Sequence, residues 1–381
     1  MIRSRPFVHP LRKAPIMPHE HRPVRSLAIL GPGEPGFFGY DEAPAAEGEA
    51  RLDLMFTGLS AGTELTLLKG SNPYLHSRWD DQAGLFMPGE PSARYPVNFL
   101  GYMEVARVSE SRAAGLAQGD VVATTFGHKT GHMAQVAGDM MLRLPPTIDP
   151  MLGIFVAQMG PIAANGILHA DALQFGAVVP QLGAGLAGRP VVVWGGGTVG
   201  LFCALFARRG GATEVVIAEP SPFRRQIAER MGFVALDEAQ ALQHAKSWGS
   251  PAGGRGAEIV FQTRARSDSL HRALQALRPQ GTVIDLAFYQ GGMDAVRLGE
   301  EFHHNGLSIS CAQINRMPRA LAHSWDRRRL AQETLGLLAE DGGSIRDHMI
   351  THVVGFDEAP AFLRHLLAER PDFLQIVFDA T

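Results

Sequence analysis

The stretch VVVWGGGTVGLFCALFA, residues 191–207, constrains the fold of this chain more than any other part of it. Four apolar residues of strand length precede a run of glycines, and an apolar helical run follows. Gly195, Gly197 and Gly200 fit the spacing G-x-G-x-x-G. In this context the first glycine permits a tight turn, the second lets the backbone approach a pyrophosphate, and the third lets helix and strand pack closely. The stretch therefore predicts a dinucleotide-binding turn with the phosphates at the helix N-terminus.

The next strand signal, EVVIAE, ends at Glu219, at about the spacing expected for an acid that binds the adenosine ribose. A carboxylate there accepts hydrogen bonds from the ribose hydroxyls and repels a 2′-phosphate, so NAD is favoured. Arg224 and Arg225 follow closely and leave NADP open. We assign the following residues to the cofactor site: Gly195, Gly197, Thr198, Val199, Gly200, Glu219, Arg224, Thr263 and Ala287.

The two halves of the chain have different patterns. After Pro190, strand signals such as EIVFQT and TVIDLAF alternate with helical ones such as SPFRRQIAERMGF and SLHRALQALRPQG, which predicts βαβ units and a parallel sheet. From residue 24 to about 150, short strand signals such as VRSLAIL, ARLDLMF and GDVVATTF are separated by glycine and proline. This part predicts a β-rich, barrel-like domain, with GPGEPGFFGYDEAPAAEGE as turn material between two of its strands.

Composition excludes several other classes of protein. The 381 residues are 45% apolar, enough for two domains with sizeable cores. A formal net charge of -3 gives no electrostatic case for binding nucleic acid or an anionic membrane. The two cysteines follow no disulfide or metal spacing, which suits the reducing cytoplasm. No signal peptide or transmembrane run is evident, so we expect a cytoplasmic protein with a small-molecule substrate.

Residues 71–96, SNPYLHSRWDDQAGLFMPGEPSARYP, have no clear periodicity. Proline, glycine, aromatic and charged residues dominate the segment. Long irregular loops in compact enzymes are often lids or substrate walls. A surface excursion without a role in the site is the alternative, and the sequence leaves both open.

Several motifs together resemble the medium-chain dehydrogenase/reductase superfamily. GLSAGTELTLLKG resembles its early loop, GYMEVARV its Gly-His-Glu strand, LAQGDVVAT its GDxV turn, and VVVWGGGTVG its cofactor loop. NPYL, RWD, GHKTGH, EFHHNGLSISCAQI and ITHVVGFDEAP resemble a branch related to bacteriochlorophyllide dehydrogenases. The resemblance implies a GroES-like β-barrel catalytic domain over residues 1–157 with an extension at 1–23. It further implies a doubly wound Rossmann domain over 158–315, and a return to the first domain over 316–381. GLSISCAQI resembles the strand that pairs across the family's homodimer.

The family's catalytic zinc lacks its usual ligands in this chain. The corresponding positions resemble Ser60, Tyr102 and the pair Gln158–Met159, none of which is a normal zinc ligand. The four-cysteine structural lobe is absent because the chain has only two cysteines. Histidine pairs at 128/132 and 303/304 could offer metal ligands, but a lone histidine pair is more often a polar or packing element than a metal site. We therefore expect a dehydrogenase fold without zinc or any other metal.

Without a metal, another group must polarise or protonate the substrate oxygen. Tyr102 is the leading candidate, because its hydroxyl lies where a metal ligand would be. Thr63 and Glu64 resemble the hydroxyl and acid of the family's proton-handling loop, and His132 and His303 are further candidates. The alternative that Tyr102 only lines the cleft and has no chemical role stays open. The resulting hypothesis is a zinc-independent, NAD(H)-dependent oxidoreductase acting on a carbonyl or secondary alcohol.

Three competing interpretations remain. GLSAG, residues 58–62, matches the nucleophile elbow of serine hydrolases, but a hydrolase does not explain the dinucleotide loop. Zinc-free members of the superfamily reduce quinones or enones, usually with NADPH, and Glu219 argues against that cofactor. A protein that binds NAD(P) without turning anything over is the third alternative.

Overall fold

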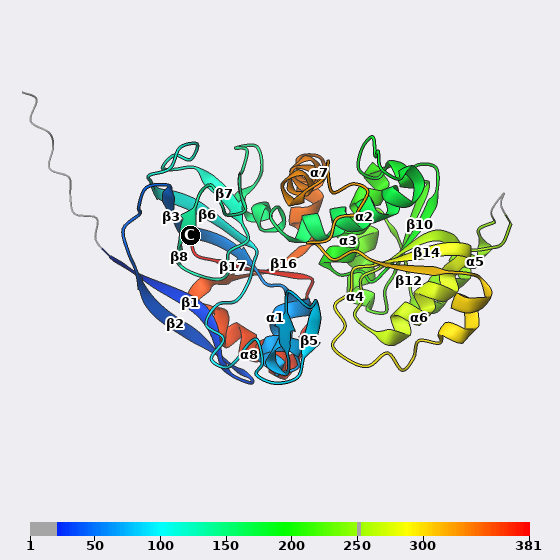
Figure 1. The fold of residues 1–381 in the computed structure, drawn as a ribbon, viewed down its shortest axis with the longest axis horizontal. Helices are drawn as coiled ribbons and strands as arrows, with labels where there is room; N and C mark the ends of the chain where they lie inside the picture. The colour runs from blue at the N-terminus through cyan, green and yellow to red at the C-terminus, as the bar shows by residue number, and fades with distance from the viewer. Residues whose placement is uncertain (1–20, 250–252) are drawn as a thin grey trace, which may run out of the picture.

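The computed structural model describes residues 21–249 and 253–381 and places two domains side by side (Figure 1). Residues 1–20 of the predicted extension lie outside the described residues. Arg22 and Pro23, the last two residues assigned to that extension, belong to the first strand. The expected combination of a β-rich domain and a doubly wound parallel-sheet domain is confirmed. The exact boundaries at 157/158 and 315/316 stay a prediction.

The β-rich domain is built on a seven-stranded sheet with the order β16-β17-β3-β6-β7-β9, and β8 also pairs with β3. A separate antiparallel hairpin, β1–β2, packs beside it. The strands are β1 (Arg22–Gly31), β2 (Glu34–Glu42), β3 (Glu49–Gly58), β6 (Glu104–Ser111), β7 (Val121–Thr124), β8 (Gly131–Gln135), β9 (Met141–Arg143), β16 (Ile350–Gly355) and β17 (Gln375–Asp379). The segment expected to be turn material therefore contains β2. Gly33, at φ +77, makes the tight turn that lets Pro35 and the residues after it pair back along β1.

The second domain carries a six-stranded parallel sheet with the order β12-β11-β10-β13-β14-β15. Its strands are β10 (Pro190–Trp194), β11 (Glu214–Ala218), β12 (Val234–Leu236), β13 (Ala257–Gln262), β14 (Leu277–Asp285) and β15 (Ser308–Cys311). The helices between or beside them are α2 (Met159–Phe175), α3 (Thr198–Arg209), α4 (Pro222–Arg230), α5 (Glu238–Ser247) and α6 (Ser267–Ala276). The strand order reverses between β10 and β13. Ligands of doubly wound parallel sheets bind at such a reversal.

Alternation along β10 explains why helices cover both faces of this sheet. Val191 and Val193 are buried in one apolar cluster with α2 and α3. Val192 and Trp194 are buried in another with α5 and α6. A strand that is apolar at every position is typical of such a doubly covered parallel sheet.

Three further helices connect the domains and complete the first one. They are α1 (Ala61–Lys69), α7 (Arg327–His348) and α8 (Ala359–Glu369). The helix α7 packs against α2, while α8 lies beside β2, at the bottom of Figure 1. After α7 the chain returns to the first domain, where β17 pairs with β3. Among the residues that the structure describes, no helix is long and apolar enough to cross a membrane.

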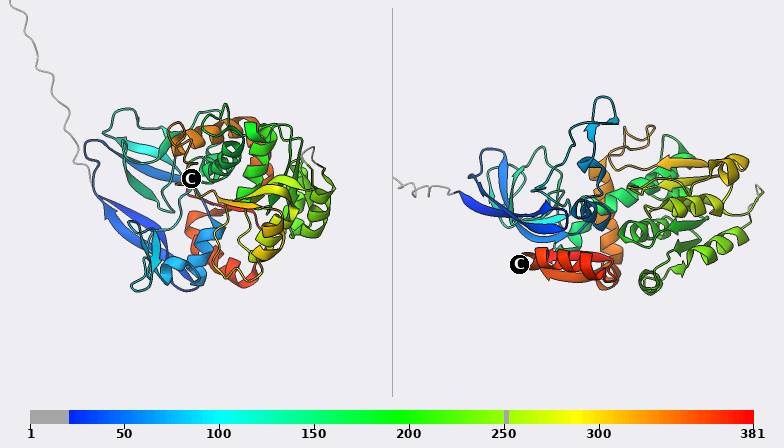
Figure 2. Two further views of the ribbon diagram at one scale, coloured as in Figure 1. Left: turned by 45° about the vertical axis from the view of Figure 1, so that its right-hand side comes forward. Right: turned by 90° about the horizontal axis from the view of Figure 1, so that it is seen from below.

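The irregular segment 71–96 forms a small antiparallel hairpin of β4 (Arg78–Asp80) and β5 (Leu85–Met87). The hairpin projects from the first domain and is seen at the top of the right-hand view in Figure 2. Phe86 packs against Tyr74 and Trp79, with ring centroids 5.6 and 4.9 Å apart. No residue of 71–96 lines the cleft between the domains. The geometry therefore favours the surface-excursion interpretation over the lid.

A buried carboxyl group lies inside the first domain. Glu104 is fully buried, its Oε2 accepts a hydrogen bond from Thr124 Oγ1 at 2.8 Å, and its Oε1 has no partner. Burial raises the pKa of this carboxyl to about 8, and the negative charge of Glu42 adds to the rise. The Thr124 hydrogen bond and the positive charges of Lys129 and Arg22 offset part of it. The protein thus folds around a neutral carboxyl group at neutral pH.

We expect the variant Glu104→Gln to be more stable than the unchanged protein at pH 9, by about 1–3 kcal/mol. An unfolded carboxyl ionises near its ordinary pKa of 4.5, whereas the folded one keeps its proton up to about 8. The unchanged protein therefore loses stability as pH rises through this interval, and the amide does not. Urea unfolding at pH 5, 7 and 9 measures the difference, which should be smallest at pH 5 and grow toward pH 9. The exposed Glu47→Gln is the control. A destabilised Glu104→Gln at pH 9 would mean that the folded protein needs the charge.

Candidate active site

A cleft of about 880 Å³ runs between the two domains. The first domain contributes the start of α1, Tyr102 and the segment from α8 to Gln375. The second domain contributes the glycine loop and the segments that follow β13 and β14. The predicted site residues that line the cleft are Thr63, Tyr102, Gly197, Thr198, Val199, Gly200, Arg224, Thr263 and Ala287. Gly195 begins the glycine loop without lining the cleft, and Glu219 lies directly behind the loop.

The glycine loop has the geometry that its sequence predicts. Gly195 adopts φ +110, where other residues are strained. A Cβ on Gly200 would lie 1.9 Å from the carbonyl oxygen of Gly195, so only glycine allows this contact. Gly197 is the N-cap of α3 and offers no side-chain cap, which leaves the first amides of the helix free for an anion. The nearest atom to a Cβ on Gly197 would be Arg224 Nη1, at 3.8 Å.

Glu219 holds the glycine loop in place through hydrogen bonds to backbone amides. Its Oε2 accepts a hydrogen bond from the amide of Gly196 at 2.8 Å, and its Oε1 accepts one from the amide of Ser221 at 2.9 Å. The side chain is buried, with 3% exposed. Because each carboxylate oxygen has two acceptor sites, one on each oxygen stays available to a ribose hydroxyl. Arg225 donates to the backbone oxygens of Glu219 and Pro220, both at 2.8 Å.

Three hydroxyl side chains meet on the first domain's side of the cleft; we call Ser60, Thr63 and Tyr102 the hydroxyl cluster. The Tyr102 hydroxyl donates to Thr63 Oγ1 at 3.2 Å and shares a hydrogen bond with Ser60 Oγ. Burial raises the pKa of the Tyr102 hydroxyl above its ordinary value of 10.0, and the hydrogen bonds with Ser60 and Thr63 offset part of the rise. Tyr102 is therefore a neutral hydrogen-bond donor at physiological pH.

Glu64 lies behind this cluster rather than in the cleft. Its Oε1 accepts from the Ser60 amide at 2.8 Å, and its Oε2 accepts from Nε2 of His128 at 2.5 Å. Thr57 Oγ1 lies 2.8 Å from the other ring nitrogen of His128. Both members of the Glu64–His128 pair are buried. Glu64 therefore holds the backbone at Ser60, and the predicted direct role in proton handling does not fit this position.

His128 is the residue that sequence reasoning missed as a partner of the site. Its ring packs against Gly101, where an added Cβ would lie 2.9 Å from the imidazole, and Gly101 precedes Tyr102. The histidine thus touches both segments that carry the hydroxyl cluster. The sequence signal that could have pointed to His128 was Glu64, since a buried carboxylate needs a hydrogen-bond donor.

His132 and His303 do not reach the cleft, contrary to their prediction as further catalytic candidates. His132 lies on β8, stacks on Phe126 and accepts from Lys129 Nζ at 3.2 Å. Burial, followed by the charges of Lys129 and Arg22, lowers the pKa of His132 to about 3, so it does not exchange protons near neutral pH. His303 is exposed at the end of η4 (Leu298–Phe302), on the second domain.

The donors at the expected zinc positions do not fit that metal. Ser60 and Tyr102 offer neutral hydroxyls that hydrogen-bond to each other. The Gln158 side-chain oxygen accepts a hydrogen bond from Arg327 instead of facing the cleft. Zinc sites of this type are built from thiolate, imidazole and carboxylate donors. The neighbouring Glu64 and His128 bond directly at 2.5 Å, which leaves no room for an ion between them.

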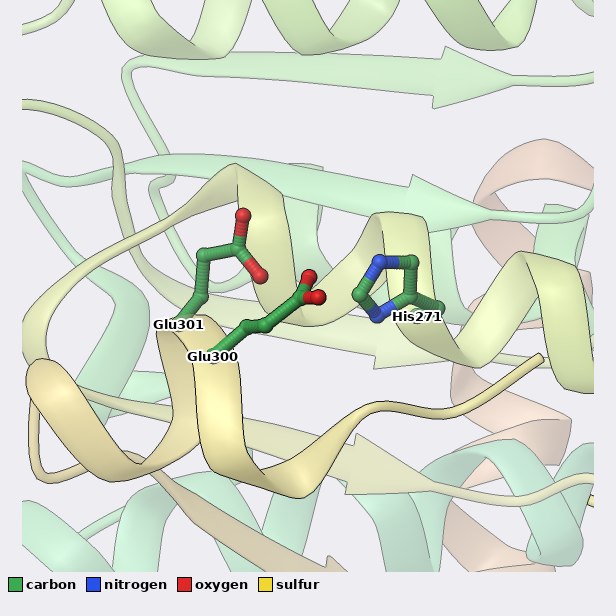
Figure 3. A group of neighbouring side chains, drawn as sticks. All are labelled: His271, Glu300 and Glu301. Carbon is green, nitrogen blue, oxygen red and sulfur yellow. The ribbon is translucent and has the colours of Figure 1, made fainter. Parts of the chain in front are cut away.

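Within residues 21–249 and 253–381, one group of three metal-type donors occurs, at His271, Glu300 and Glu301 (Figure 3). Their ligand atoms lie within 4.8 Å of one another, on α6 and η4. None of the three lines the cleft, and Glu300 already forms an ion pair with Arg297 at 3.2 Å. This group is separate from the hydroxyl cluster.

Comparison with known proteins gives three consistent results. Residues 198–324 match the family described as zinc-binding dehydrogenase. The D-guloside 3-dehydrogenase of Escherichia coli (strain K12) is 23% identical over 355 residues, which cover 92% of this chain and 97% of that protein. The alcohol dehydrogenase TADH of Thermus sp. ATN1 has the same fold, with a TM-score of 0.68, 16% identity, and coverage of 94% and 100%.

A fourth comparison includes a bound cofactor. A Sinorhizobium meliloti 1021 protein, provisionally assigned as a zinc-binding dehydrogenase, was crystallised with NADP. It superposes with a TM-score of 0.66 at 19% identity and covers 94% of this chain and 99% of its own. The structural superpositions establish a common fold, and the chemistry of each cleft must be argued from its own residues.

Proposed function

We propose that this chain, an oxidoreductase of the medium-chain dehydrogenase/reductase superfamily, transfers a hydride between NAD(H) and a carbonyl or secondary alcohol without a catalytic zinc ion. One observation carries the proposal: a phosphate-binding glycine loop and the hydroxyl cluster line the same cleft. A nicotinamide cofactor, when bound, supplies or accepts the hydride. The protein then has to bind the cofactor, orient the substrate and handle one proton.

The hydroxyl cluster is suited to the proton. Tyr102 keeps its proton at neutral pH because burial raises its pKa, so it can donate a hydrogen bond to a substrate carbonyl oxygen. Ser60 and Thr63 hold the tyrosine hydroxyl in place. In the direction of reduction, Tyr102 would give its proton to the substrate oxygen, and Ser60 and Thr63 would hydrogen-bond to the phenolate left behind. A proton from water would then restore the phenol. Glu64, which is bonded to His128, holds the backbone of Ser60 and so fixes the position of the hydroxyl cluster.

NAD is favoured over NADP because of Glu219. A carboxylate bonded to Gly196 lies where the adenosine ribose of a Rossmann ligand is bound. A 2′-phosphate there would meet a buried negative charge, whereas the two ribose hydroxyls would find acceptors. Arg225 is occupied by backbone oxygens, which leaves Arg224 as the nearer cation for a third phosphate.

We expect NADH to bind at least about 10-fold more tightly than NADPH, an advantage of about 1.4 kcal/mol. Fluorescence titration of protein whose metal content has been measured gives both dissociation constants. In Glu219→Gln the negative charge is gone, so the ratio of the NADPH to the NADH dissociation constant should fall toward one.

Tighter binding of NADPH, with enone or quinone turnover, would favour the reductase alternative. Binding without turnover of any carbonyl would favour the non-catalytic alternative, and stoichiometric zinc in the isolated protein would contradict zinc independence.

We also propose a homodimer in the cytoplasm. The strand β15 is the edge of the parallel sheet, and Ser308, Ile309 and Cys311 on it are exposed. An uncovered edge strand with exposed backbone groups is suited to pairing with a second copy. The cysteines at 203 and 311 are both free, as expected in a reducing compartment.

A further inference from the structure

The substrate end of the cleft is enclosed by a loop from the second domain. Gln290 Nε2 donates to the carbonyl oxygen of Gly62 at 3.1 Å, and its Oε1 accepts from Ser71 Oγ at 3.3 Å. These contacts place residues 286–290 across the start of α1, next to the hydroxyl cluster. Phe288 lines the cleft from this loop.

The walls around this end of the cleft are apolar. They are formed by Leu65, Met159, Ile162, Leu286 and Phe288. Leu286 packs firmly, because an added Cβ on Gly166 of α2 would lie 2.8 Å from it. Phe288 is 39% exposed, so it presents an apolar ring to the cleft. A wall of this kind favours a ligand with an apolar body.

Acidic, asparagine and histidine side chains, which could bind several substrate hydroxyls, are lacking from the part of the cleft lining that the structure describes. No aspartate, glutamate, asparagine or histidine occurs among the described residues that line the cleft. The amide of Gln375 is occupied: it donates to Leu59 at 3.0 Å and Ile376 at 2.9 Å, and accepts from Thr198 at 3.3 Å. Among the uncharged side chains at this end, the hydroxyl cluster is left to bind a substrate oxygen.

Five basic side chains line the cleft: Lys69, Arg224, Arg264, Arg266 and Arg370. Arg264 is paired with Glu238 at 3.0 Å, and Arg266 with Asp268 at 3.2 Å. Both arginines follow β13, on the cofactor side of the cleft. Arg224 donates to the carbonyl oxygen of Phe373 at 3.4 Å and lies beside the glycine loop.

From these observations we infer the substrate class: a ketone or secondary alcohol with an apolar body and a single oxygen for the hydroxyl cluster, and not a sugar or polyol. The inference rests on the proposed function. A buried hydroxyl without a partner costs about 10-fold in affinity. A polyol would present several such groups to apolar walls, whereas each buried methylene of an alkyl ketone gains about fourfold.

The test uses three ketones that share the reacting group at C2. D-Xylulose and 2-pentanone have the same number of carbons and differ in hydroxyl groups, and 2-octanone extends the apolar chain. With full-length protein and NADH, we expect 2-pentanone to exceed D-xylulose in kcat/KM by at least about 100-fold. 2-Octanone should exceed 2-pentanone by about 10-fold or more. Phe288→Ser should reduce the advantage of 2-octanone, and Val178→Ser, which is 76% exposed and outside the cleft, should not.

Binding separates failure of this inference from failure of the proposed function. Thermal shift of the protein saturated with NADH is measured with each ketone. Stabilisation by 2-octanone and not by D-xylulose supports the substrate class even if turnover is absent, in which case the proposed catalysis fails. Stabilisation by D-xylulose alone, or by neither ketone while NADH is bound, overturns the substrate class. Absence of NADH binding overturns the proposed function, and the substrate class with it.

Discussion

Replacing Gly200 with alanine is expected to lower the affinity for NADH by at least about 100-fold. The added methyl group would lie 1.9 Å from the carbonyl oxygen of Gly195 and 2.9 Å from Thr263 Oγ1. The first of these neighbours is backbone, so relief requires the glycine loop to move away from the helix that it begins. The loop amides would then no longer converge on a phosphate. Isothermal titration with NADH measures the loss.

Two other glycines separate a binding effect from a folding effect. A Cβ on Gly197 would have Arg224 Nη1 as its nearest neighbour, at 3.8 Å, so Gly197→Ala should fold normally. It should still weaken NADH binding, because Gly197 is where the backbone approaches the pyrophosphate. Gly343→Ala, in α7, meets nothing within 4 Å, so it should leave the affinity unchanged and raise Tm slightly, because alanine favours a helix interior over glycine. Undiminished affinity in Gly200→Ala would refute the phosphate-binding role of this loop.

Removing the hydroxyl of Tyr102 should have the second largest effect. Tyr102→Phe is expected to reduce kcat by about 10²–10³-fold while the dissociation constant of NADH changes by less than about twofold. The reason is that, under the proposed function, the phenol donates to the substrate oxygen on which charge develops, whereas the cofactor phosphates would bind at the glycine loop. Ketone reduction under saturating NADH, together with a separate NADH titration, checks both numbers.

The matched control for this change is Tyr74→Phe, an exposed tyrosine outside the cleft, which should leave kcat unaltered. Ser60→Ala should have an intermediate effect of about 10-fold, because it removes one partner of the Tyr102 hydroxyl. An unchanged kcat in Tyr102→Phe would make the tyrosine a cleft-wall residue only.

Local sequence predicted the second domain well because its signals are local. The strand before Gly195, the glycine spacing and the acid at 219 all lie within one βαβ unit, and the structure has them in register. Helix limits were less accurate. The segment SLHRALQALRPQG was expected to be one helix, yet α6 ends at Ala276 and β14 begins at Leu277. Burial of Leu277 in the sheet outweighs its helix propensity.

The site in the first domain depends on contacts that sequence spacing does not encode. Glu64 and His128 are 64 residues apart and meet only because α1 and the turn before β8 are both anchored on β3. His128 and His132 were indistinguishable in GHKTGH. Yet His128 lies in a turn facing Glu64, whereas His132 points to Phe126 and Lys129. Similarly, the β1–β2 hairpin was hidden because its second strand is rich in glycine and proline, which signal turns.

The position of β17 has a consequence for the order in which the protein is made. This strand lies between β16 and β3, and its first residue, Gln375, bonds to Leu59 in the first domain and Thr198 in the second. On the ribosome, the parallel-sheet domain can therefore form while synthesis continues, since its strands end at Cys311. The sheet of the first domain must wait until residue 379 has emerged. The cleft between the domains is thus the last part of the molecule to be assembled. A chain that ends before β17 would have a folded parallel-sheet domain beside a first-domain sheet in which the edge of β3 that pairs with β17 is unpaired.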